Sequence, residues 1–272
     1  MKIYSDKALS QQLEKIEARY NAEFVHSRLR MFPDSGAEWI EVDGTYAMFD
    51  GLESPLTQTF GLGLFEKLSL KTIEKLEKFY QRFSAPIFHE LSPMADSCHM
   101  DILYKCGYQP VELTSILYKS LLEEGSTHQL INPEIATQQM REGEEELWAL
   151  TSAKGWSTEA PGLYEIIYEF AQIASRSRGV QPFFVNLNDK PISTGMLYID
   201  NDIALLAGDS TIAEGRNRGA QNALVDARLS YATDHGCSIA MMAASPGSQS
   251  QKNAEKKGFR LAYTRTKWKL RT

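Results

Sequence analysis

Apolar residues recur at helical spacing in two distant parts of this chain, and the same features follow them in both. In the first half a strand-like run and a Ser-Pro pair follow over residues 86–93. In the second half the same two features follow over residues 237–246. The apolar positions of the two predicted helices are Ile73, Leu76, Phe79, Tyr80 and Phe83 in the first half, and Ala220, Leu224, Ala227 and Tyr231 in the second.

The two stretches also end alike. A polar helix end, a Gly-aromatic pair and a terminal strand close each of them, over residues 103–121 and 255–270. Gly107 and Gly258 would supply the left-handed conformation that stops each helix. Four elements in one order indicate two copies of one α/β unit. They are joined over residues 121–132, where Glu-Glu-Gly-Ser-Thr is typical of a linker.

We therefore expect two domains, residues 1–125 and 126–272. In the second, strand patterns over residues 183–187, 194–199 and 203–207 predict a meander, with a turn at Asn-Asp-Lys-Pro between the first two. The fold class is then α/β (α+β), with a mixed, largely antiparallel sheet flanked by helices in each unit. An amphipathic helix precedes the meander, with apolar residues at Leu163, Ile166, Ile167, Phe170 and Ile173.

Composition narrows the class of protein. Hydrophobic residues make up 43% and aromatic residues 10% of the 272-residue chain, enough for a packed core. Apolar runs of membrane-spanning length and a secretory signal are absent from the sequence. The three cysteines are too scattered for a disulfide framework or a zinc site, the histidines show no metal-ligand spacing, and we expect no bound metal. These features favour a cytoplasmic protein without a membrane partner.

Charge points away from nucleic acid and toward a compact anion. The net charge of −6 is opposite to what a general nucleic-acid binder needs. Residues 201–272 nevertheless hold eleven basic against six acidic residues, a net +5, so the first 200 residues carry −11. An excess of positive charge in one segment favours an anionic ligand there, although a chance fluctuation of surface charge would look the same.

The basic segment contains a loop suited to phosphate. Gly215-Arg-Asn-Arg-Gly-Ala-Gln221 lies between a predicted strand and a helix predicted over residues 220–235. Amides at the start of a helix lack internal partners and the helix dipole favours an anion there. Gly219 has no Cβ to keep a phosphate from the backbone, and two arginines add charge. Neither a Walker loop nor a three-glycine dinucleotide fingerprint fits these residues.

The same segment resembles a known family. Residues 207–224 resemble the central motif of GNAT acetyltransferases, Arg/Gln-x-x-Gly-x-Gly/Ala after the fourth strand. Residues 250–259 resemble the family's second motif, with an Asn ahead of Gly-Phe. The resemblance covers residues 133–270, and residues 1–121 look like a degenerate second copy in a tandem arrangement. The degenerate copy lacks the paired arginines, and we expect it to bind no coenzyme.

The resemblance implies an acetyl-CoA-dependent N-acyltransferase that moves an acetyl or short acyl group to an amine by direct attack. It implies that the loop amides hold the coenzyme A pyrophosphate and that the end of the fourth strand pairs with the pantetheine arm. Gln221 departs from the family, which has Gly or Ala there. The residues so assigned to the coenzyme are Ser210, Thr211, Ile212, Arg216, Asn217, Arg218, Gly219, Ala220, Gln221, Asn222 and Asn253.

The proton-transfer groups are less evident. Asp209 lies beside the predicted acyl site and would act as a base, directly or through water, or else cap the adjacent loop. Many family members supply the acid from a Tyr four residues before the Gly of Gly-Phe, and this chain has Ala254 there. Tyr263 and Ser250 are the available substitutes.

Two other functions remain open at this point. The missing Tyr would suit a non-catalytic acyl-CoA-binding or partner-binding protein. Paired GNAT-like units also occur in aminoacyl-tRNA-dependent peptidyl transferases. The acidic first half of this chain disfavours that function, because negative charge repels the tRNA phosphates. The acceptor predicted for an acyltransferase is a small-molecule or peptide amine, and neither its identity nor the oligomeric state can be inferred from the residues.

Overall fold

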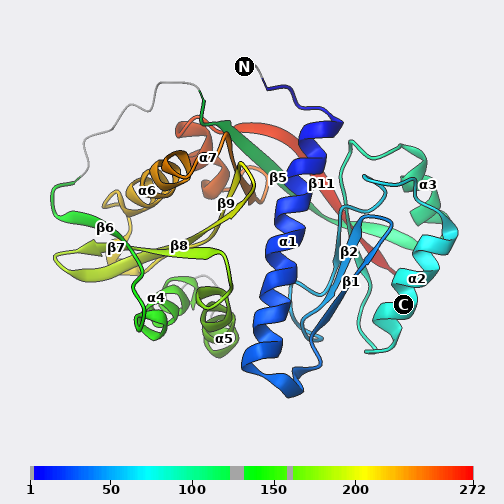
Figure 1. The fold of residues 1–272 in the computed structure, drawn as a ribbon, viewed down its shortest axis with the longest axis horizontal. Helices are drawn as coiled ribbons and strands as arrows, with labels where there is room; N and C mark the ends of the chain where they lie inside the picture. Colours follow the sequence, from blue (N-terminus) through cyan, green and yellow to red (C-terminus); the bar gives the residue numbers. More distant parts are fainter. Residues whose placement is uncertain (1–2, 123–131, 158–161, 272) are drawn as a thin grey trace. The chain divides into compact units, whose positions relative to one another are not determined.

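The computed structural model describes residues 3–122, 132–157 and 162–271 (Figure 1). The chain forms two compact units that are not separated by a single cut. The first consists of Met1–Tyr118, Ala243–Ala254 and Arg260–Thr272, and the second of Lys119–Met242 and Glu255–Phe259. Most of the linker predicted over residues 121–132 lies outside the described residues.

The first unit is a mixed sheet in the strand order β1-β2-β3-β4-β11-β5. Its neighbouring strands are antiparallel, except that β3 and β4 run parallel. Its elements are α1 (Lys7–Met31), η1 (Pro33–Ser35), β1 (Glu38–Val42), β2 (Thr45–Phe49), β3 (Thr59–Phe60), α2 (Leu70–Gln81), β4 (Phe88–Leu91), α3 (Cys98–Lys105), β5 (Tyr108–Ser120) and β11 (Arg260–Leu270).

Helices cover both faces of this sheet, and the alternation along β2 shows how. Tyr46 and Met48 share one apolar cluster with residues of α1, whereas Ala47 and Phe49 share another with residues of α2. All five β2 residues are buried, as expected for a strand covered on both sides. Helix α1 has 25 residues, yet no helix in the described part of the chain is both long and apolar enough to cross a membrane.

The last strand of the chain belongs to the first unit. β11 pairs with β4 on one side and with β5 on the other, for example Thr266 with Leu91 and with Leu113. The division expected at residues 125 and 126 therefore differs from the compact units. A terminal strand pattern identifies a strand but not the strands it will pair with.

The second unit is a sheet in the order β10-β9-β8-β7-β6, antiparallel except for β9 and β10. Figure 1 shows α4 and α5 on one face of its strands and α6 on the other. Its elements are β6 (Ile135–Gln139), α4 (Glu145–Ser157), α5 (Tyr164–Ser175), β7 (Val180–Leu187), β8 (Lys190–Asp200), β9 (Ile203–Thr211), η2 (Ala213–Gly215), α6 (Ala220–Asp234) and β10 (Ile239–Ala244); α7 (Gln249–Lys256) spans parts of both units.

The structure confirms the fold class and the repeated order of elements. Helix, strand, Ser-Pro, helix, Gly-aromatic and strand occur as α2, β4, α3, β5 and again as α6, β10, α7, β11. Gly107 and Gly258 follow the second helix of each series with φ of 89° and 85°, the left-handed conformation expected of them. The predicted meander is present as β7, β8 and β9, and the helix predicted before it as α5.

A buried ionic cluster joins α1 to the sheet of the first unit. Arg265, on β11 and 3% exposed, lies 2.9 Å from Glu17, 3.1 Å from Glu90 and 3.4 Å from Glu14. Tyr263 donates to Glu14 at 2.9 Å. Burial raises the pKa of Glu14 to about 7, against the attraction of Arg265, and the charges of Glu17 and Glu90 raise it further.

Glu14 should therefore make stability depend on pH near neutrality. Since its pKa is higher folded than unfolded, the stability it contributes is complete below pH 4.5 and is lost as pH rises through about 7. Between pH 5 and 8 we expect wild type to lose about 2 kcal/mol of unfolding free energy relative to Glu14→Gln. Urea denaturation of both proteins across this range measures the difference. Parallel stability curves would contradict the prediction.

Candidate functional site

Strand β9, the fourth strand of the second unit in chain order, contains a bulge. Met196 on β8 pairs with Ala207 and Thr194 pairs with Ser210, so Gly195 faces two residues, Gly208 and Asp209. Gly208 has φ of 67°, the left-handed conformation that lets a strand accommodate an extra residue. The bulge turns the Asp209 side chain toward α6.

Asp209 is held there by a buried arginine from α6. Arg228 Nη2 lies 2.8 Å from one Asp209 oxygen, and Nη1 donates to the other. The Gln221 side chain also donates to Asp209. Arg228 is fully buried, whereas the Asp209 side chain is 18% exposed. Hydrogen bonds from these two side chains fix the orientation of the Asp209 carboxylate. They also occupy lone pairs that the carboxylate would need to accept a proton as a base.

Arg228 also ties the bulge to its neighbours. It donates to the Met196 carbonyl at 3.0 Å, to the Ala207 carbonyl at 3.4 Å and to Leu224 on its own helix at 3.2 Å. A Cβ on Gly195 would come within 2.9 Å of both Arg228 and Asp209, so only glycine fits without a shift there. The guanidinium therefore fixes the two strands around the bulge relative to the start of α6.

The pairing of β9 with β10 ends before the bulge. The two strands pair in parallel at only three positions, ending at Leu205 with Met241, while β9 continues to Thr211. Helix α4 packs against this end of β9: Ser210 Oγ donates to the Ser152 carbonyl at 2.8 Å, and a Cβ on Gly155 would clash with Ser210. The Ile212 amide donates to the Ile192 carbonyl at 3.0 Å, so it is not free to polarise an acyl carbonyl.

The predicted phosphate loop lies directly after this strand. Residues 216–219 are exposed, Asn217 and Gly219 have φ of 58° and 91°, and Gly219 is the N-cap of α6. Within the described residues, the amides from Arg218 to Asn222 have no hydrogen-bond acceptor, and the first turn of α6 holds no acidic residue. Unpaired amides at the positive end of a helix form an anion-binding surface.

The loop side chains leave these amides open. Arg218 Nε donates to the Glu214 carbonyl at 3.0 Å, and Arg216 Nη2 lies 3.5 Å from the Gly155 carbonyl. The Gln221 side chain is engaged with Asp209 on β9, so the larger residue at this family position does not cover the loop. The site can therefore hold a pyrophosphate with backbone donors and one or two guanidinium groups.

The other predicted site residues belong to the first unit. Tyr263 lies on β11, is 6% exposed and donates to Glu14. Burial, reinforced by the Glu14 charge, raises its pKa well above the usual value. Ser250 and Asn253 lie on α7, where the Asn253 side chain accepts from Gln249 at 2.8 Å. The structure thus places Asp209 beside the predicted phosphate loop within the second unit. Tyr263 is instead hydrogen-bonded to Glu14 in the first unit.

In the first unit, the start of α2 is satisfied by the protein itself. Ser69 accepts from the Thr72 amide at 3.1 Å, and the Thr72 hydroxyl donates to Asp43 at 2.7 Å. His99 accepts from the Leu68 amide at 3.2 Å and lies so close to Gly63 that a Cβ there would clash with its ring. An acidic residue and an imidazole thus stand where the second unit presents free amides.

Sequence reasoning missed Arg228, Gly195 and Gly155. One signal existed for Arg228. It lies four residues after Leu224 and eight after Ala220, on the face of the helix predicted to be apolar. A charged residue on such a face indicates a buried ion pair. The two glycines give no comparable signal, because close approach of other elements is visible only in the fold.

Among known proteins, the matches to this chain are solved structures with a similar fold. No protein-family model and no curated protein matches the chain. A GCN5-related N-acetyltransferase from Kribbella flavida has a TM-score of 0.65, with 12% identity over 92% of this chain and 95% of that one. A tandem GNAT protein from the clavulanic acid biosynthesis pathway, solved without AcCoA, has a TM-score of 0.62, with 10% identity over 99% and 98%.

A GCN5-related N-acetyltransferase from Sphaerobacter thermophilus has a TM-score of 0.60, with 13% identity over 84% of this chain and 77% of that one. Identities this low show the fold alone. At that level the chain shares the fold of these proteins, as the resemblance predicts, and one of them is described as a tandem GNAT protein.

Proposed function

We propose that this protein, whose chain has the fold of the GCN5-related N-acetyltransferases in tandem form, transfers an acetyl or short acyl group from acetyl-CoA to an amine. The observation that carries the proposal is the row of unpaired amides from Arg218 to Asn222 at the start of α6, exposed and next to two arginines. These amides would hold the coenzyme pyrophosphate, with Arg216 and Arg218 adding charge.

The early end of the pairing between β9 and β10 supports the rest of the assignment. On the side away from β8, this part of β9 has no paired strand among the described residues, so backbone groups of Ser210 and Thr211 on that edge can pair with an extended ligand. The pantetheine arm would lie along it, with the thioester near the bulge. The amine nitrogen would then attack the thioester carbon, the carbon–sulfur bond would break, and the amine proton would leave as the thiolate gains one.

Asp209 would act in this reaction chiefly by position. Its contacts with Arg228 and Gln221 favour an orienting role, because they tie the bulge to the helix that carries the loop. A base role would run through its exposed edge and a water molecule. Tyr263 and Ser250 stay candidate acids, and the Glu14 contact counts against Tyr263. The three cysteines, all without disulfides, favour a reducing cytoplasm.

A second function is favoured by a specific observation. Ala254 is buried at the position where many members of the resembled family have the Tyr that acts as the acid. The substitute Tyr263 donates its hydroxyl hydrogen to Glu14 instead. The protein would then bind acyl-CoA without transferring the acyl group. Release of free thiol from acetyl-CoA, with a panel of amines, amino acids and peptides, separates the two. Coenzyme binding with no thiol release for any acceptor would favour the binder.

The loop itself is tested by Arg218→Glu/Gly219→Trp. The charge reversal and the bulky side chain at φ of 91° should lower coenzyme A affinity by at least about tenfold, or about 1.4 kcal/mol. Calorimetric titration with coenzyme A measures this loss. The matched control is Arg141→Glu/Gly143→Trp, an exposed pair in the same unit with the same charge change and a glycine at φ of 90°. Equal affinity in both double variants would rule out the loop as the coenzyme site.

A further inference from the structure

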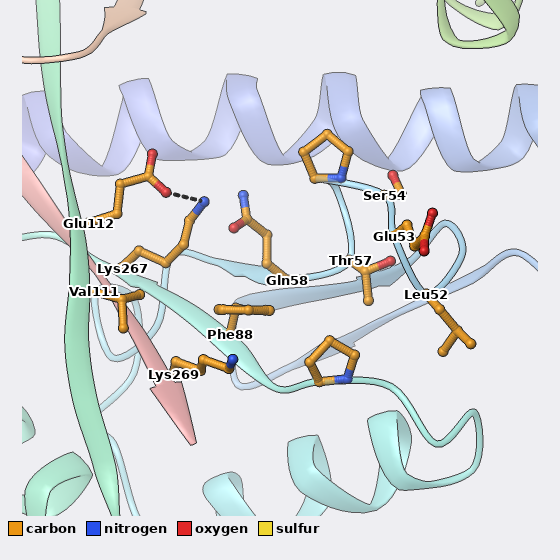
Figure 2. A pocket seen from close by; sticks show the side chains of 12 residues that line it. Leu52, Glu53, Ser54, Thr57, Gln58, Phe88, Val111, Glu112, Lys267 and Lys269 are labelled. Atoms are coloured by element: carbon orange, nitrogen blue, oxygen red, sulfur yellow. Dashed lines mark ion pairs between the residues drawn. The ribbon is translucent and has the colours of Figure 1, made fainter. Parts of the chain in front are cut away.

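The first unit contains a pocket of about 600 Å³ that is lined by two lysines of β11 (Figure 2). Lys267 Nζ lies 3.0 Å from Glu112 and 3.6 Å from Glu90. The Lys269 ammonium lies over the Phe88 ring, 5.5 Å from its centroid. Figure 2 shows the two ammonium groups on opposite sides of Phe88. The two cations are therefore not placed to hold one anionic group together, and the chemistry of this pocket does not select a ligand class.

In the second unit, Gln221 contacts two parts of the proposed acyl-transfer site at once. It is the second residue of α6, and its backbone amide is one of the unpaired amides from Arg218 to Asn222. Its side-chain nitrogen donates to Asp209 on β9. One residue thus belongs to the phosphate loop through its backbone and reaches the carboxylate of the bulge through its side chain.

Asp209 accepts hydrogen bonds from two residues of α6 that lie seven positions apart, on one face of the helix. Arg228 is fully buried and meets both carboxylate oxygens with its terminal nitrogens. Gln221 is half-buried and meets one of these oxygens from the first turn of the helix. The contact through Gln221 is therefore the one that a coenzyme bound in the loop can influence directly.

The residue type at position 221 makes this connection possible. The resembled family has Gly or Ala there, and neither side chain is long enough to carry a donor to Asp209. Fixing a long side chain and its backbone costs conformational entropy. When two contacts fix the same residue, the second to form pays less of this cost. A phosphate oxygen on the Gln221 amide and Asp209 on its side chain would therefore strengthen each other.

We propose that Gln221 couples coenzyme binding to the position of Asp209, an inference that rests on the acyl-transfer function proposed above. Coenzyme in the loop fixes the Gln221 backbone, and the side chain then holds the Asp209 carboxylate more firmly while the acyl donor is present. Because coupling between binding events is reciprocal, the contact with Asp209 also favours coenzyme binding. Gln221 is in this way a positioning residue.

Two replacements of Gln221 separate the coupling from simpler roles. Gln221→Ala introduces the family residue, and Gln221→Met keeps the length without the donor. Each should weaken coenzyme A binding by about threefold or more, as measured by calorimetric titration. If Gln221 only obstructed the loop, alanine would strengthen binding. If it only supported the helix, alanine would not weaken binding, because alanine is the better helix former.

The matched control is Gln172→Met, which should bind coenzyme A like wild type. Gln172 is also a half-buried helix glutamine of the second unit with one side-chain hydrogen bond, to the Tyr168 hydroxyl at 3.0 Å. With any amine that is acetylated, Gln221→Met should lower kcat as well as raise the KM for acetyl-CoA. A change confined to the loop would raise KM alone.

Asp209→Ala completes a double-mutant cycle, because it removes the acceptor of the Gln221 side chain. In this background Gln221→Met should leave coenzyme affinity nearly unchanged. If Asp209→Ala is not folded by circular dichroism, the background is Asp209→Ala/Arg228→Met, in which no buried arginine is left without its carboxylate.

Three results would overturn the coupling: equal effects of Gln221→Met with and without Asp209, unchanged or tighter coenzyme binding in Gln221→Ala, or no coenzyme A binding by wild type. The cycle needs binding only, whereas thiol release tests the transfer. A non-additive cycle therefore supports the coupling even where no amine is acetylated, and an additive cycle overturns it even where amines are acetylated.

Discussion

Arg265→Met should lower the free energy of unfolding by about 3–5 kcal/mol at pH 7, because it leaves buried carboxylates without their cation. Arg265 is 3% exposed, and its positive charge compensates three carboxylates. Two of them come from α1 and one from β4: Glu14, Glu17 and Glu90. Methionine keeps much of the side-chain volume, so the loss reports charge rather than a cavity. In the variant, Glu14 can become neutral by taking up a proton, since burial already raises its pKa. Glu17 is partly in contact with water, which lowers the cost of its unpaired charge.

Urea denaturation of wild type and variant measures this loss. The control is Arg271→Met, at an exposed residue of the same terminal segment, for which a change within about 0.5 kcal/mol is expected. Adding Glu14→Gln to Arg265→Met should recover part of the loss, because one unpaired acid is removed. A loss below about 1 kcal/mol in the single variant would mean that the carboxylates find other partners.

Arg228→Met should be damaging in two ways. It leaves Asp209 without its cation and the carbonyls of Met196 and Ala207 without the Arg228 donor, which predicts a loss of about 3–5 kcal/mol in stability. It also removes the contacts that fix Asp209 in the bulge, and Asp209 in turn holds the Gln221 side chain, so coenzyme A affinity should fall by about tenfold or more. Arg228 is in this sense a positioning residue.

Arg228→Lys and the double variant Asp209→Asn/Arg228→Met separate charge from geometry. Lysine keeps the charge but cannot make the paired contact with Asp209, so it should recover stability better than coenzyme affinity. The double variant should lose less stability than the sum of its single changes, because no carboxylate is left unpaired. Calorimetric titration and urea denaturation give the two readouts. Wild-type coenzyme affinity in a folded Arg228→Met protein would refute the positioning role.

Much of the fold could be predicted from local pattern. The helices α2 and α6, the meander β7 to β9 and the glycines that end α3 and α7 all follow from periodicity and backbone preference. The partners of β11 could not be predicted, because they depend on strands far away in the sequence. The apolar pattern does not predict helix α1 either, because its buried face includes the polar residues Ser10 and Glu14.

The site shows the same division between local and distant information. The phosphate loop follows from a glycine, two arginines and a helix start within a few residues of each other. The bulge depends on the register of two strands, and the pairing of Asp209 with Arg228 joins residues on different elements. Residue type alone makes Tyr263 a candidate acid, whereas its contact with Glu14 joins residues far apart in the sequence and is visible only in the fold.

The position of β11 has a consequence for how this protein is made. Ribosomes release a chain from its amino end, and units generally fold as they emerge. The sheet of the first unit places β11 between β4 and β5, so this sheet stays incomplete until residues 260–270 have left the ribosome. The second unit, whose strands lie between residues 135 and 244, can form first. The half translated earliest is therefore the last to complete its sheet, and a fragment ending at residue 125 would lack an internal strand.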